Sequence, residues 1–149
     1  MSETLKITYI QTELTWEDPK ANTTHFEQKL SECPADSDVI ILPEMFTTGF
    51  SMNAKANAED VAEVLGWLKT QSKKFQVALT GSAMVKENGK FYNRLFFVEP
   101  DGQVSKYDKK HLFTLAGEHK IYSPGTERCV VEYKDWKICL QVCYDLRFP

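Results

Sequence analysis

The sequence Asp38-Val39-Ile40-Ile41-Leu42-Pro43-Glu44 is an apolar run that stops abruptly at a carboxylate. A second run, Ile138-Cys139-Leu140-Gln141-Val142-Cys143-Tyr144-Asp145, reaches a thiol in the same way. Each run contains β-branched residues and predicts a buried strand. Ligands in open α/β sheets bind at the carboxyl ends of strands. We therefore expect one site that is built from both endings.

Strand and helix patterns alternate along the rest of the chain. Strand patterns cover residues 5–11, 39–42, 76–82, 91–99, 128–133 and 136–142. Helical patterns cover residues 19–33 and 58–75, and Asp18-Pro19 is typical of an N-cap followed by the first helical position. Asn88-Gly89 and Asp101-Gly102 are typical turn sequences. This order predicts an α/β layered domain over residues 1–149.

Length and charge exclude several classes of partner. The chain has 149 residues, enough for one domain with a real core. Its net charge of −3 gives no reason to expect a nucleic acid or a membrane as partner, and no apolar run approaches a membrane span. The first residues lack the pattern of a signal peptide, so we expect a cytoplasmic protein.

The cysteines do not form a metal site. Cys33, Cys129, Cys139 and Cys143 have neither Cys-x-x-Cys spacing nor the histidine spacing of a zinc site, so we expect no metal and free thiols. Cys139 and Cys143 are four apart, and on a strand they would face the same way. A lone cysteine is usually an inert apolar residue, and it becomes a nucleophile beside a base and a positive charge.

The end of the chain follows the second run closely. Residues 148–149 come a few positions after Cys143, and the strand predicted at 136–142 would be an exposed edge. We therefore expect residues 1–149 to be the first part of a longer protein. Expressed alone, they should be poorly soluble or partly molten, and inactive.

Each candidate residue has an ordinary alternative. Glu44 has the apolar neighbours Met45 and Phe46, which would desolvate it and suit it to accepting a proton, although loop carboxylates are common. Lys109 and Lys110 fit a solvated charge run. His111 is more often a structural, hydrogen-bonding residue than a catalyst.

Taken together, the segments around Glu44, Lys109 and Cys143 resemble the nitrilase, or carbon–nitrogen hydrolase, superfamily. Its pattern is a glutamate after a strand, a lysine before a His-Leu-Phe stretch, and a cysteine in a Cys-Tyr-Asp-x-Arg-Phe stretch. The resemblance implies a four-layer α-β-β-α sandwich, of which this chain is the N-terminal part. It implies catalysis by these three residues without a cofactor, on a small amide and water, in a homodimer.

The resemblance also selects supporting residues. The family lysine stands two positions before the histidine, which favours Lys109 over Lys110. A second family glutamate maps to Glu118, which would position the substrate or tune Lys109, whereas a surface loop residue is the alternative. The backbone N–H of Tyr144 would help Lys109 to stabilise an oxyanion.

The string from Leu42 to Met52 resembles the bacterial omega-amidase branch of the superfamily. Members of this branch hydrolyse the terminal amide of short 2-oxo dicarboxylic monoamides such as 2-oxoglutaramate, and a cysteine thioester would be the intermediate. Other amides, nitriles and N-carbamoyl compounds remain alternative substrates, because the three catalytic residues are common to all. A non-catalytic binding or assembly module that retains the motifs is a further alternative.

Overall fold

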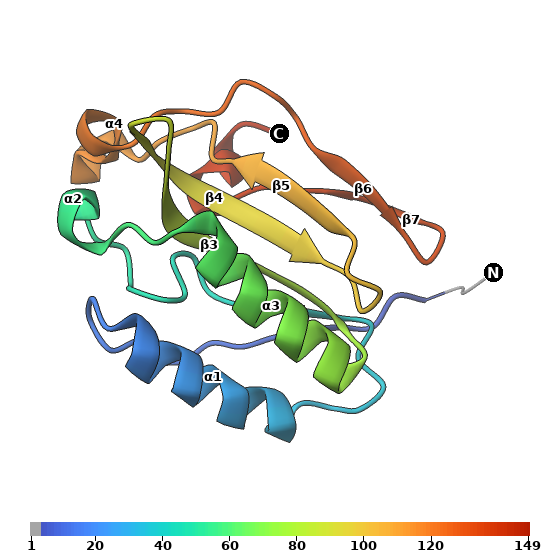
Figure 1. The fold of residues 1–149 in the computed structure, drawn as a ribbon. Coiled ribbons are helices and arrows are strands. Elements are labelled where there is room, and N and C mark those ends of the chain that lie inside the picture. The colour runs from blue at the N-terminus through green and yellow to red at the C-terminus, as the bar shows by residue number, and fades with distance from the viewer. Residues whose placement is uncertain (1–3) are drawn as a thin grey trace.

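The computed structural model describes residues 4–149. Its main element is a five-stranded sheet with the order β1-β2-β3-β4-β5 (Figure 1). The strands are β1 (Ile7–Tyr9), β2 (Val39–Ile41), β3 (Ala78–Glu87), β4 (Lys90–Val98) and β5 (Val104–Asp108). The first three run parallel, and β4 and β5 continue the sheet antiparallel. A hairpin of β6 (Val130–Tyr133) and β7 (Trp136–Cys139) forms a second, two-stranded sheet.

Two long helices, α1 (Pro19–Glu32) and α3 (Val61–Phe75), lie side by side on one face of the large sheet (Figure 1). Asp18 caps α1, as predicted, by accepting a hydrogen bond from the Ala21 N–H at 3.0 Å. The shorter helical elements lie in connections; they are α2 (Ala54–Asn57), η1 (Thr114–Ala116), α4 (Glu118–Ile121) and η2 (Cys143–Arg147). No helix among residues 4–149 is both long and apolar enough to cross a membrane.

Apolar side chains fill the space on both faces of the large sheet. Phe26 of α1 and Leu68 of α3 pack against Phe96 of β4, whereas Phe97 faces the hairpin and contacts Tyr133. The alternation of Phe96 and Phe97 follows the two-residue period of a strand. The layers are thus helices, large sheet and small sheet, as expected for this α/β class. This order corresponds to three layers of the four-layer sandwich that the resemblance implies.

The structure corrects several predicted boundaries around α3. The helix begins at Val61 rather than at residue 58, because Asp60 caps it by accepting the Ala62 N–H. The sequence predicts that Gln76 begins a strand, but in the structure it ends the helix in a left-handed conformation with φ of 52°. Strand β3 then starts at Ala78 and runs beyond residue 82 to Glu87, because it pairs with β4 along its full length.

The two ends of the chain contain shorter strands than the sequence predicted. β1 covers only Ile7–Tyr9 instead of residues 5–11, and β7 ends at Cys139 instead of residue 142. Cys143 therefore does not share a strand with Cys139, and it begins η2. The prediction that an unbroken strand ends on this thiol is wrong, because side-chain hydrogen bonds to residue 142 replace the strand ladder there.

Candidate active site

Lys109 follows the last residue of β5 and its backbone is fixed on both sides. Its N–H donates to the Asn93 carbonyl at 2.9 Å, and its carbonyl accepts from the Gly125 N–H at 3.0 Å. The residue before it, Asp108, forms a bidentate ion pair with the buried Arg94, with contacts of 2.7 and 3.1 Å. These contacts define the position of Lys109 at the end of the sheet.

The Lys109 side chain is wholly buried between two carboxylates. Its Nζ donates to Glu44 Oε1 at 2.7 Å and to Glu118 Oε2 at 3.0 Å. Burial would lower the pKa of this ammonium, but hydrogen bonds and charges from the two carboxylates raise it above its ordinary value. The solvated-charge alternative is therefore wrong for Lys109, whereas Lys110 is exposed.

Glu44 lies in a tight turn after β2, held against β3. The Met45 N–H donates to Ser82 Oγ at 2.9 Å, and Met45 itself has φ of 48°, a left-handed conformation that non-glycine residues seldom adopt. Gly81 allows this close approach, because a Cβ there would lie 2.8 Å from Leu42 Cβ. The Glu44 side chain remains 19% exposed, so its carboxylate is accessible.

Glu118 is fully buried, which overturns the surface-loop alternative for this residue. It begins α4, and its Oε2 accepts the Phe113 N–H at 2.5 Å as well as the Lys109 ammonium. Phe113 directly precedes η1 and Lys109 directly follows β5, so Glu118 connects the two segments. Its carboxylate is bonded to protein groups that include the Lys109 ammonium.

Asn93, on β4, is a member of this cluster that the sequence analysis missed. Its Nδ2 donates to Glu44 Oε1 at 2.9 Å and to Glu118 Oε1 at 3.1 Å, and the residue is only 1% exposed. The available signal was a polar side chain inside an apolar strand. Buried polar groups need partners, and the partners here are the two carboxylates.

Cys143 is the first residue of η2 and is exposed, with φ of 45°. Partial burial raises the pKa of its thiol, the Glu44 and Glu118 charges raise it further, and the Lys109 charge opposes them. The thiol is therefore near enough to the Glu44, Lys109 and Glu118 side chains to interact with their charges. A thiol with a raised pKa is protonated at neutral pH, so it needs a base before it can act as a nucleophile.

Asp145 joins the turn that carries Cys143 to the segment after Lys109. One carboxylate oxygen accepts from the backbone N–H and the Nδ1 of His111, both at 2.8 Å. The other accepts from Tyr107 Oη at 2.8 Å and from the Val142 N–H at 3.0 Å. His111 is therefore a structural, hydrogen-bonding residue, as its sequence context favoured.

Aromatic side chains surround the same turn. The Tyr144 ring packs edge-on against Phe113 and Phe148, with centroids 5.3 and 5.4 Å away. Phe148 in turn stacks on His111 at 4.2 Å. These contacts hold η2 close to the residues that follow Lys109.

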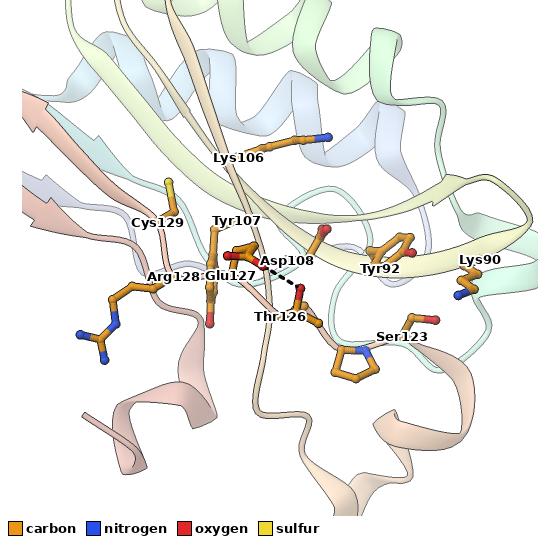
Figure 2. Close-up of a pocket in the computed structure, with 12 residues that line it drawn as sticks. Lys90, Tyr92, Lys106, Tyr107, Asp108, Ser123, Thr126, Glu127, Arg128 and Cys129 are labelled. Atoms are coloured by element: carbon orange, nitrogen blue, oxygen red, sulfur yellow. Dashed lines mark hydrogen bonds between the residues drawn. The ribbon is translucent and has the colours of Figure 1, made fainter.

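A separate cavity of about 650 Å³ lies along β5, between Tyr107 and the segment 123–129 (Figure 2). Its lining includes Asp108 and Arg128 but none of the four clustered residues or Cys143. We therefore locate the candidate site at the buried ion cluster and not at this cavity. Within residues 4–149, no group of three or more His, Cys, Asp or Glu side chains is arranged to hold a metal ion.

Comparisons with known proteins identify the family to which the chain is similar. The family model described as carbon-nitrogen hydrolase matches residues 6–149. The chain is 49% identical to "Omega-amidase YafV" of Yersinia enterocolitica over 98% of this chain and 57% of the relative. It is 34% identical to "2-oxoglutaramate amidase" of Bacillus subtilis over 96% of this chain and 57% of that protein.

A solved structure from Xanthomonas campestris superposes with a TM-score of 0.93 and 42% identity, over 97% of this chain and 55% of the other. It is described as a CN-hydrolase superfamily protein with an arsenic adduct in the active site. This chain thus spans a little over half the length of the relatives that it matches.

Proposed function

This chain belongs to the carbon–nitrogen hydrolase family, and we propose that it carries the catalytic residues of an amidase that acts through a cysteine thioester. The observation that carries this proposal is the Lys109 ammonium, buried between Glu44 and Glu118 with the Cys143 thiol beside it. An ordinary structural ion pair would not need an exposed thiol at its edge. The arrangement supplies a nucleophile, a base and a cation in one place.

In the first half of the proposed reaction, Cys143 Sγ attacks the amide carbon while its proton passes to Glu44. The C–S bond forms and the carbonyl electrons move to the oxygen, where Lys109 and the Tyr144 backbone N–H stabilise the charge. An oxyanion donor of this kind is worth roughly 3–4 kcal/mol in the barrier. Glu44 then gives the proton to the nitrogen, the C–N bond breaks, and ammonia leaves a thioester on Cys143.

In the second half, water attacks the thioester carbon and gives a proton to Glu44. The C–S bond breaks, the sulfur takes the proton back, and the carboxylic acid leaves. Glu44 therefore acts twice as base and twice as acid, which requires it to be accessible, and its side chain is partly exposed. Glu118 holds the Lys109 ammonium in place throughout.

The substrate that we propose is the terminal amide of a short 2-oxo dicarboxylic monoamide such as 2-oxoglutaramate. Support for this class comes from relatives named omega-amidase and 2-oxoglutaramate amidase, at 49% and 34% identity. The protein is expected to act as a homodimer, which light scattering would test.

Ammonia release by the protein expressed from its complete gene tests the substrate class. We would compare 2-oxoglutaramate with glutaramate, which lacks only the 2-oxo group, and with a nitrile and an N-carbamoyl amino acid of similar size. We expect the highest kcat/KM for 2-oxoglutaramate. A higher value for the nitrile or the N-carbamoyl compound would contradict the substrate class. No turnover of any compound, with slow and uniform labelling of all four cysteines, would indicate a non-catalytic module.

A further inference from the structure

The Asn93 side chain is shared between the two carboxylates of the ion cluster. Its amide nitrogen lies 2.9 Å from Glu44 Oε1 and 3.1 Å from Glu118 Oε1. The Asn93 carbonyl also accepts the Lys109 backbone N–H, so the residue contacts all three charged members. A neutral side chain is thus placed where it can hold the geometry of the whole cluster.

The Asn93 amide is oriented with its nitrogen toward the two carboxylates. Its Oδ1 is buried and has no hydrogen-bond partner among residues 4–149, which is unfavourable for an amide oxygen. Turning the amide over would point that oxygen at two carboxylates and remove both N–H donors from them. The observed orientation instead gives each carboxyl group one N–H donor, and such hydrogen bonds are strongest when the acceptor is an ionised carboxylate.

The cluster contains more carboxylate groups than ammonium groups. Glu44 and Glu118 together carry two negative charges against the single positive charge of Lys109. The other titratable groups that interact with Glu44 are the Cys143 thiol and Tyr122, and the phenol of Tyr122 donates to the Ser51 carbonyl at 2.6 Å. Neither adds a positive charge, and Asn93 is the neutral side chain that donates to both carboxylates, whereas the Phe113 N–H donates to Glu118 alone.

The hydrogen bonds to Glu44 also distinguish its two oxygens. Lys109 Nζ and Asn93 Nδ2 both donate to Oε1, and neither donates to Oε2. A carboxylate that is held by one oxygen presents the other to its surroundings. Oε2 is then the oxygen available to the Cys143 thiol.

We propose that Asn93 is a positioning residue that holds Glu44 and Glu118 around one ammonium and leaves Glu44 Oε2 free to accept the Cys143 proton. This inference rests on the proposed function, because it assigns Asn93 a role through the base Glu44. The role assigned to Asn93 is exerted through Glu44 and Glu118 and not on the reacting atoms.

The test is the pH dependence of kcat/KM in the protein expressed from its complete gene. Asn93→Ala removes a donor to a charged group, which favours the protonated carboxylate, so the acid limb of the profile should move up by about one pH unit. At neutral pH we expect kcat/KM to fall about tenfold. Asn93→Asp keeps the shape of the side chain, and it should also move the acid limb upward if the Ala variant fails to fold.

Asn22→Ala is the matched control. Asn22 is also an asparagine that is 1% exposed, but it bonds to Thr15 and Thr47 rather than to a carboxylate. We expect it to lower stability without moving the acid limb. An unmoved acid limb in both Asn93 variants, or an equal shift in the Asn22 variant, would overturn the proposal.

Alkylation of Cys143 by iodoacetamide separates this inference from the proposed function. Alkylation requires the loss of the Cys143 proton, for which Glu44 is the proposed acceptor, but it requires no amide hydrolysis. Its pH profile therefore reports on the effect of Asn93 on Glu44 even if the wild type hydrolyses none of the amides. The Asn93→Ala profile should shift upward by about one pH unit relative to wild type. Identical alkylation profiles in the two proteins would overturn the role of Asn93, whereas absent turnover with a shifted alkylation profile would overturn only the amidase proposal.

Discussion

Replacing Lys109 with methionine removes the charge at the centre of the cluster while keeping most of the side-chain volume. The ammonium is completely buried and lies 2.7 Å from Glu44 and 3.0 Å from Glu118. Removing one partner of a buried ion pair leaves uncompensated charge, which costs about 3–5 kcal/mol. We therefore expect Lys109→Met to lower the free energy of unfolding by that amount and to lower kcat/KM at least about a hundredfold.

The pH dependence of this loss follows from the raised pKa of Lys109. A lysine whose pKa is higher in the folded state stabilises the fold below its unfolded pKa of about 10.4. That stabilisation is lost as the pH rises through the folded pKa. The difference between wild type and Lys109→Met should therefore be constant from pH 7 to pH 9 and should shrink at more alkaline pH.

Urea unfolding at pH 7 and pH 9 measures the stability, and ammonia release measures kcat/KM. The neighbouring Lys110→Met is the matched control, because Lys110 is exposed and its backbone N–H, which the substitution keeps, donates to Tyr107 Oη at 3.2 Å. We expect this variant to stay within about 0.5 kcal/mol of wild type. Equal losses in the two lysine variants would refute the assignment of Lys109.

Three further predictions concern the residues that position the cluster. A Cβ on Gly125 would lie 2.1 Å from the Asp108 carbonyl oxygen, so Gly125→Ala should shift the end of β5. We expect the free energy of unfolding to fall by about 1–3 kcal/mol in urea and kcat to fall in the ammonia assay. Burial alone would raise the pKa of the Asp145 carboxyl group, but its hydrogen bonds outweigh burial and the net pKa is lowered. The ionised carboxylate therefore stabilises the fold at neutral pH, and this stabilisation is lost as the pH falls through the folded pKa. Asp145→Asn should therefore be about 1–3 kcal/mol less stable at pH 7, with a gap that narrows below about pH 4 in urea unfolding. Cys143→Ala should abolish ammonia release, whereas Cys129→Ala should keep most of it; normal turnover by the first variant would refute the nucleophile.

The sequence predicted the cluster better than it predicted the elements that carry it. Glu44 and Lys109 are 65 residues apart, yet their side chains meet at one end of the sheet, where β2 and β5 both end. The burial of Lys109 was not predictable from its own segment, because Tyr107-Asp108-Lys109-Lys110 has the composition of an exposed charge run. Its burial depends on carboxylates that come from other parts of the chain.

Asn93 and Asp145 were missed for related reasons. Asn93 lies in β4, and the pairing of β4 with its neighbouring strands brings its backbone carbonyl to Lys109 and its side chain to Glu44. Asp145 was quoted in the Cys-Tyr-Asp stretch, but its hydrogen bonds to Tyr107 and His111 depend on contacts that are distant in sequence. Asp145 also accepts the Val142 N–H, which replaces the strand ladder before Cys143 and which local strand propensity could not indicate.

Trapping the covalent intermediate is the most direct test of Cys143 as the nucleophile. The protein expressed from its complete gene would be mixed with 2-oxoglutaramate and quenched in acid within the first turnover, and its peptides would be analysed by mass spectrometry. We expect an acyl group, added with loss of ammonia, on the peptide that contains Cys143. Glu44→Gln should give no such adduct. Turnover without an adduct on Cys143, or an adduct on Cys33, Cys129 or Cys139 instead, would contradict the proposed mechanism.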